Sequence, residues 1–348
     1  MNDLKKEKIA IETIKVLRSR FESFPEDSSN NRNAPFHEAF IGAFRDKFEE
    51  NQITDISYLV SLSSWLHGLS TTLGQNFFEN TAFILSDGYK KGFTEKENNR
   101  LQITQGQKNA VDEIFTDLKN SNNSPNLNEE NEIILGANNT SRKLEAKDFT
   151  VDVFIESDDT ILAVELKSVK PNKGEMGGEK HKILEAKAAL QNTYPNKTIS
   201  YFIGFPFDPT DSDGAGYDKS RFLNNLIDGK RYFAEDETLV AEELWTKLSG
   251  ENDSMSIILE IINKVATPEF MNKYNYILDY EKRTSDPEGY EEQLQEWMLY
   301  REIRLFNNSD KIINAGENII RKFNKPLFKK NGEYDMDRYS ELEEIINH

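Results

Sequence analysis

The chain has 348 residues, a formal net charge of −18, 37% hydrophobic residues and 30% charged residues, and its length suits one large domain or two ordinary ones. It has no cysteine and only four histidines, which excludes disulfides, thiolate zinc sites and cysteine nucleophiles. Any bound metal is expected to be hard and held by oxygen atoms. The net charge argues against a protein that coats nucleic acid, but a local basic cleft on an acidic body is still compatible with it.

No apolar run approaches the roughly 18 residues that a membrane span needs. The charged, amphipathic start of the chain also lacks the apolar core of a secretory signal. We therefore expect a cytoplasmic protein with no membrane partner.

The first 130 residues read as mainly helical. In chain order, the predicted elements are a helix over 3–23, a polar loop over 24–35, a helix opened by Pro35, a long helix over 53–90 broken near Gly68 or Gly74, a helix over 104–119 and an Asn/Ser/Glu-rich loop over 120–131.

The pattern then changes to β-branched and apolar runs. These predict strands over 149–156 and 160–168, a Gly- and Lys-rich loop over 170–178, a helix over 179–194 and a strand over 198–205. Further helices are predicted over 218–228, 238–249, 254–266, 269–283, 290–305 and 310–324. The expected fold is α/β, with helices packed on a mixed sheet and helical additions at both ends.

We predict a single domain because no linker divides the chain. Within it, residues 1–68 would be a helical addition and 69–207 the core. Residues 208–348 would be a largely helical region for recognition or dimerisation.

Charged residues interrupt the two neighbouring apolar strands. A short turn after Glu156 would place Glu156 opposite Ile161, and the same register places Asp152 opposite Glu165. Opposed side chains have Cβ atoms about 4.5–5.5 Å apart. Lys167 shares the strand face of Glu165, so two carboxylates and an ammonium group should converge.

Two opposed carboxylates repel one another unless a cation lies between them. A divalent ion would accept oxygens from both strands, polarise a phosphoryl oxygen and lower the pKa of a bound water. Lys167 would orient or deprotonate that water, or stabilise charge on the phosphate. This pattern favours metal-dependent attack on a phosphodiester.

A hairpin with a solvated face is the alternative, because Glu-x-Lys by itself is not specific. The tripeptide occurs three times in the chain, at 145–147, 165–167 and 185–187. The first copy lies in a polar segment before the first predicted strand, and the third is predicted to be a solvated charge pair on a helix. The middle copy alone lies in an apolar strand.

Asp152 followed by Glu165-Leu166-Lys167, a helix and a strand resembles the PD-(D/E)xK nuclease superfamily. The resemblance implies that Asp152 and Glu165 bind Mg²⁺, that Leu166 lends its backbone carbonyl, and that Lys167 serves the attacking water. Val151 stands where the family often has proline.

Many members of that superfamily carry an acidic residue on a preceding helix. Glu79, within the apolar segment 73–85, is the candidate here, and Glu38 is a weaker rival. The alternative for Glu79 is a solvent-facing position at the rim of the helix.

Three longer segments, 63–85, 152–176 and 204–233, together resemble type II restriction endonucleases of the TdeIII-like group. The resemblance implies an endonuclease that cuts both strands of DNA at a short, near-palindromic site of the GGNCC type. It also implies a cognate DNA methyltransferase that acts on the same site. We expect a homodimer, because two-fold symmetry matches a palindromic site.

A basic segment follows the hairpin. Residues 167–187 hold six lysines against three glutamates, a local net charge of about +3. Four of these lysines flank the Gly-rich loop and the start of a helix, where phosphates bind readily. We predict DNA contacts for these four: Lys170, Lys173, Lys180 and Lys182. The alternative is a solvated loop and helix face.

A second basic cluster, 321–330, interleaves two phenylalanines with Arg and Lys. It suits a DNA-contacting arm or a C-terminal helix cap about equally.

Two other functions are compatible with the same core: a DNA repair or recombination nuclease, and a nuclease-fold DNA-binding module without catalysis. The complete set of Asp152, Glu165 and Lys167 argues against the second, because binding alone does not need two opposed carboxylates.

Overall fold

The computed structural model describes residues 1–25, 56–137, 140–167, 174–211 and 215–347. These residues form two compact units. The first contains Phe78–Leu259, together with Met1, and the second contains Asn2–Phe77 and Glu260–His348. The domain boundaries expected from the sequence stay a prediction.

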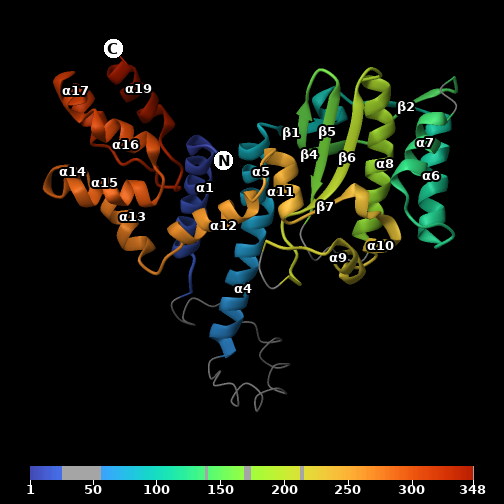
Figure 1. Cartoon of the computed structure of the whole chain (residues 1–348), viewed down its shortest axis with the longest axis horizontal. Helices are drawn as coiled ribbons and strands as arrows, with labels where there is room; N and C mark the ends of the chain where they lie inside the picture. The colour runs from blue at the N-terminus through green and yellow to red at the C-terminus, as the bar shows by residue number, and fades with distance from the viewer. Residues whose placement is uncertain (26–55, 138–139, 168–173, 212–214, 348) are drawn as a thin grey trace. The chain divides into compact units, whose positions relative to one another are not determined.

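A five-stranded mixed sheet forms the centre of the first unit, with strand order β1-β4-β5-β6-β7 (Figure 1). Its strands are β1 (Tyr89–Phe93), β4 (Phe149–Glu156), β5 (Thr160–Leu166), β6 (Thr198–Phe205) and β7 (Thr238–Val240). The first three strands pair antiparallel, and β5, β6 and β7 pair parallel. The mixed α/β fold predicted from the sequence is confirmed.

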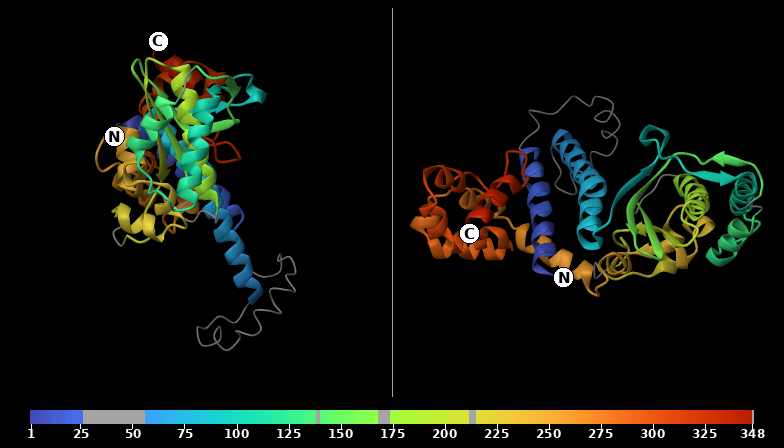
Figure 2. Two further views of the ribbon diagram at one scale, coloured as in Figure 1. Left: turned by 90° about the vertical axis from the view of Figure 1, so that its right-hand side faces the viewer. Right: turned by 90° about the horizontal axis from the view of Figure 1, so that it is seen from above.

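Helices cover both faces of this sheet (Figure 1). One face carries α8 (Glu175–Thr193), and α6 (Gln105–Lys119) packs beside α8, as Figure 2 also shows. The other face carries α5 (Phe78–Ser86) and α11 (Glu242–Ser249). The remaining elements of the unit are η3 (Glu95–Glu97), β2 (Gln102–Thr104), α7 (Leu127–Gly136), β3 (Lys143–Glu145), α9 (Lys219–Asn225), α10 (Gly229–Tyr232) and η4 (Glu235–Glu237).

The predicted strand register is confirmed, because Glu156 pairs with Ile161 and Val153 pairs with Val164. The next pair in the same register is Asp152 with Glu165. Parallel pairing of β5 with β6 places Tyr201 beside Ala163 and Ile203 beside Glu165. These side chains therefore share one face of the sheet with Glu165.

The second unit is helical, with Phe270 and Trp297 stacked in its core and the exposed ring of Phe21 stacked on Phe270. Its elements are α1 (Asp3–Glu22), α4 (Ile56–Thr72), the π-helical turn η2 (Leu73–Phe77), α13 (Phe270–Leu278), α14 (Lys282–Ser285), α15 (Pro287–Glu296), α16 (Tyr300–Asn307), α17 (Ser309–Asn314), α18 (Glu317–Phe323) and α19 (Met336–Asn347). Helix α12 (Ser254–Val265) runs across the boundary between the units.

Most predicted helices are present, and the predicted break near Gly74 is the π-helical turn. Several expectations were wrong, including the loop predicted to reach residue 178, since α8 already begins at Glu175. The polar segment 120–131 contains the start of α7, which Asn126 caps by accepting from the amide of Glu129. Strand β1 ends the long pattern that we expected to be helical to residue 90. Strand β7 occupies the start of the helix predicted over 238–249. The predicted helix after Pro35 lies outside the described residues.

Among the described residues, no helix is long and apolar enough to cross a membrane.

Candidate active site

The opposed carboxylates of Asp152 and Glu165 lie where β4 and β5 meet the first turns of α8. Asp152 is half-buried, and its Oδ2 accepts a hydrogen bond of 3.0 Å from the amide of Leu166. Glu165 is only 4% exposed, and its Oε2 has no hydrogen-bond partner within the described part of the chain. The two strands therefore hold one carboxylate by a backbone contact and leave an oxygen of the other unsatisfied.

Glu165 titrates far above the range of an ordinary carboxyl group. Burial, together with the nearby charge of Asp152, raises its pKa to about 7, although Lys182 and Lys167 oppose the shift. This group therefore resists carrying its charge unless cations surround it.

Two lysines supply positive charge to Glu165. Lys167 Nζ lies 3.1 Å from Glu165 Oε1, and Lys182 Nζ lies 2.7 Å from the same oxygen. Both lysines also contact Glu179, at 2.8 Å and 2.5 Å. Glu165, Lys167, Glu179 and Lys182 thus form a closed ring of alternating charge.

Lys167 is mostly buried, and burial alone would lower its pKa. The carboxylates of Glu165 and Glu179 outweigh burial and raise the pKa above its ordinary value. Lys167 therefore carries a positive charge at neutral pH.

Glu79 is the first acidic residue of α5, and Lys90 of strand β1 connects it to Asp152. Lys90 Nζ lies 3.2 Å from Glu79 Oε1 and 3.3 Å from Asp152 Oδ1. Glu79 thus faces the sheet rather than standing alone at the rim of its helix. Glu38, the rival candidate, lies outside the described residues.

Tyr201 is a neighbour of this site that we did not predict. Its hydroxyl is buried and has no hydrogen-bond partner among the described residues. Burial raises the pKa of Tyr201 well above its ordinary value, and the charges of Glu165, Asp152 and Glu179 add to the shift. The sequence signal was an isolated tyrosine in an apolar strand, which is more often a packing residue.

Lys180 contradicts our expectation of a DNA contact. Its side chain is fully buried, and its Nζ lies 2.6 Å from both Glu130 and Glu237. An ammonium group enclosed in this way cannot reach a phosphate. Lys170 and Lys173 lie outside the described residues, and Lys182 faces the carboxylates described above.

The expectation of a solvated pair at 185–187 was also wrong. Glu185 is 4% exposed and accepts a hydrogen bond of 2.7 Å from the amide of Lys147. Lys187 is 6% exposed, and burial lowers its pKa. Helical spacing alone did not reveal that α8 is enclosed by α6, α7 and the sheet.

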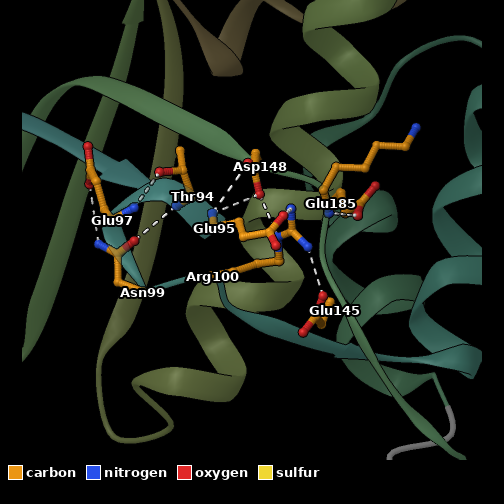
Figure 3. A network of polar contacts seen from close by, with 9 residues as sticks. Thr94, Glu95, Glu97, Asn99, Arg100, Glu145, Asp148 and Glu185 are labelled. Carbon is orange, nitrogen blue, oxygen red and sulfur yellow. Dashed lines mark hydrogen bonds and ion pairs between the residues drawn. The ribbon is translucent and has the colours of Figure 1, made fainter.

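An exposed network of ion pairs anchors the segment that leads into β4 (Figure 3). Arg100 contacts three carboxylates, those of Glu95, Glu145 and Asp148, at 3.1, 2.8 and 2.5 Å. The Arg100 guanidinium also lowers the pKa of Asp148. Because Asp148 immediately precedes β4, this network restrains the strand that carries Asp152.

The second basic cluster holds its aromatic residues inside the fold. Phe323 and Phe328 are 5% and 4% exposed, so neither can stack on a base. Lys322 pairs with Glu341, and Arg321 stays exposed beside Glu317. Among the two readings of this cluster, the burial favours a helix and its cap.

Among the described residues, no group of three or more acidic or histidine side chains is arranged to hold a metal ion. The available donors are two carboxylates, Asp152 and Glu165, and the backbone carbonyl of Leu166. Few protein ligands completed by water suit Mg²⁺, and the unsatisfied Oε2 of Glu165 is an unused donor. The donor set therefore fits a divalent cation.

Comparison with known proteins also indicates a type II restriction endonuclease. The model of the family "Type II restriction endonuclease, HinfI" matches residues 1–266. The chain is also 40% identical over 365 residues to the type II restriction enzyme MjaII of Methanocaldococcus jannaschii, with 98% of this chain and 96% of the relative covered. The expectation of a type II restriction endonuclease is confirmed, whereas the TdeIII-like group stays a resemblance. The chain belongs to the HinfI family of type II restriction endonucleases, and it is a site-specific DNA endonuclease.

Proposed function

We propose that the protein hydrolyses phosphodiester bonds in both strands of DNA with Mg²⁺ bound by Asp152, Glu165 and the carbonyl of Leu166. The observation that supports this proposal most directly is the opposed carboxylate pair, in which Glu165 is buried and keeps one oxygen unsatisfied. When bound, the cation would polarise a phosphoryl oxygen and lower the pKa of a water molecule.

The chain's own residues would supply orientation and charge. Asp152 is held toward Glu165 by its hydrogen bond from the amide of Leu166. Lys167 is protonated at neutral pH, since nearby carboxylates raise its pKa. This charge favours Lys167 as a group that orients the attacking water and stabilises the phosphate, rather than as a base that takes the proton.

Glu79 would contribute through its ion pair with Lys90, which joins it to Asp152. Lys182 would contact the DNA backbone. Lys170 and Lys173, which are assigned from the sequence alone, would contact it as well. We further propose a homodimer on a near-palindromic site of the GGNCC type, a cytoplasmic location and a cognate methyltransferase.

Digestion of unmethylated plasmid and phage DNA tests this function. We expect discrete bands with Mg²⁺ and none after EDTA is added, because the carboxylate pair requires a divalent cation. Sequencing of the cut ends gives the recognition site. A smear, or cleavage that persists in EDTA, would contradict the proposal.

Substitution of Lys167 tests the site. Lys167→Ala should reduce the single-turnover cleavage rate about a hundredfold or more, since it removes a preorganised charge next to the reacting phosphate. DNA affinity measured in Ca²⁺ should change little. Lys119→Ala, an exposed lysine in the last turn of α6, is the control. An active Lys167→Ala enzyme would refute the assignment.

A further inference from the structure

Glu179 is placed to hold both lysines of the candidate site. It lies in the second turn of α8 with its side chain 14% exposed. Its Oε1 lies 2.8 Å from Lys167 Nζ, and its Oε2 lies 2.5 Å from Lys182 Nζ. Each carboxylate oxygen therefore contacts one ammonium group.

Glu165 shares the same two lysines through a single oxygen, Oε1. The lysines therefore lie between two carboxylates that compete for them. If Glu165 gives its oxygens to a divalent cation, the two ammonium groups lose that partner and are repelled by the cation. Glu179 is then the carboxylate in close contact with both, since the third neighbour of Lys167, Glu175, is 3.9 Å away.

Glu179 is well suited to this task because it stays ionised. Burial would raise its pKa, but Lys167 and Lys182 lower the pKa below its ordinary value. Helix α8 is itself held firmly, since Lys180 on the same helix forms a buried ion cluster with Glu130 and Glu237.

We propose that Glu179 is a positioning residue. When Glu165 binds the divalent cation, Lys167 and Lys182 leave Glu165 and stay in contact with Glu179, which keeps Lys167 directed at the scissile phosphate. This inference rests on the proposed function of the site. It assigns to Glu179 no contact with the metal or the substrate.

Two consequences follow from this exchange of partners. Without the Glu179 carboxylate, both lysines would remain on Glu165 and compete with the cation, so metal binding should weaken. Lys167 would also be directed less precisely, so cleavage should be slow even when metal is saturating.

The test compares full-length wild type with Glu179→Gln, and uses Glu113→Gln, at an exposed position on α6, as the matched control. Calorimetric titration with Ca²⁺ in the absence of DNA should show affinity about tenfold weaker for Glu179→Gln, and the single-turnover rate at saturating Mg²⁺ should fall about tenfold or more. Glu113→Gln should stay within about threefold of wild type on both measurements. Wild-type affinity and rate in Glu179→Gln would overturn the inference.

A further pair of variants separates positioning from direct ligation. In a Lys167→Met/Lys182→Met background, Glu179→Gln should leave Ca²⁺ affinity unchanged, since no lysine competes for Glu165. A metal ligand would still lose affinity there, and that result would overturn the inference.

Thermal unfolding checks that each variant folds. If Glu179→Gln does not fold, Glu179→Asp decides: it keeps the charge on a shorter side chain and should give an intermediate rate. A Glu179→Asp enzyme with the wild-type rate and Ca²⁺ affinity would overturn the inference. Failure of wild type itself to cut DNA would instead contradict the proposed function.

Discussion

Individual buried charges set the chemistry and the stability of this protein. Glu165 has a raised pKa because it is buried beside Asp152, and the lysines around it only partly compensate. Glu7 on α1 shows the same effect away from the candidate site. It is 1% exposed, and burial raises its pKa to about 7 despite the nearby Arg301.

Glu7 predicts a pH dependence of stability. Its pKa in the folded state is above the ordinary value of 4.5, so the folded protein binds the extra proton, and this stabilisation is lost as pH rises through about 7. Glu7→Gln cannot titrate. Between about pH 5 and about pH 8, we therefore expect the free energy of unfolding of wild type to fall relative to the variant by on the order of 2–3 kcal/mol.

Urea unfolding at the two pH values measures this difference. Glu12→Gln, on the same helix, is the control because its carboxyl group is only half-buried. If wild type and Glu7→Gln differ in free energy of unfolding by the same amount at both pH values, the role of Glu7 is contradicted.

Substitution of Tyr201, by contrast, is expected to stabilise the protein. Because its buried hydroxyl has no partner among the described residues, Tyr201→Phe removes a desolvated polar group. We expect the metal-free protein to gain about 1 kcal/mol in free energy of unfolding. A loss of stability, measured by urea unfolding, would show that the hydroxyl has a partner.

At the scale of elements, helix α8 combines two opposite roles. One side presents Glu179 and Lys182 to the carboxylates of the sheet. Another side buries Lys180 between Glu130 of α7 and Glu237 of η4. Burial raises the pKa of Glu130, so this cluster depends on the charge of Lys180.

Lys180→Met should therefore destabilise the protein by about 3–5 kcal/mol, because two buried carboxylates would be left without their shared cation. Thermal or urea unfolding measures the loss. Lys119→Met, at an exposed site, should change stability by less than about 0.5 kcal/mol. If Lys180→Met instead weakened DNA binding and left stability intact, the buried cluster would be refuted.

At the scale of the whole molecule, one chain carries one Asp152–Glu165 pair in its described residues, so one chain would cut one strand. Two-fold symmetry of a palindromic site matches a pair of identical chains. In the proposed homodimer, a heterodimer of wild type and Lys167→Ala should thus nick its site and leave the second strand intact.

Supercoiled plasmid provides the readout. Mixed dimers should yield mainly open circles, whereas wild-type dimers yield linear DNA. Linear product formed by purified mixed dimers at the wild-type rate would contradict one active site per chain.

Local sequence determined the strands of the hairpin and their register, and it indicated the candidate site. Period-two apolar runs and a short turn are local signals, so Glu156 opposite Ile161 followed directly, and with it the pairing of Asp152 with Glu165. The helix predicted over 104–119 is present as α6, and Thr104 and Gln107 form a capping box at its start. The motif Glu165-Leu166-Lys167 then indicated a nuclease, and the family match bears this out.

Only the tertiary structure decided which charges on α8 are buried and with which partners. Lys180 and Lys182 are two residues apart and chemically identical, yet one is enclosed by α7 and η4 and the other faces Glu165 and Glu179. Spacing along a helix predicts which residues share a face, but not what packs against that face. Those partners come from segments far away in the chain, which is why the sequence determined the carboxylate pair and the fold determined the lysines around it.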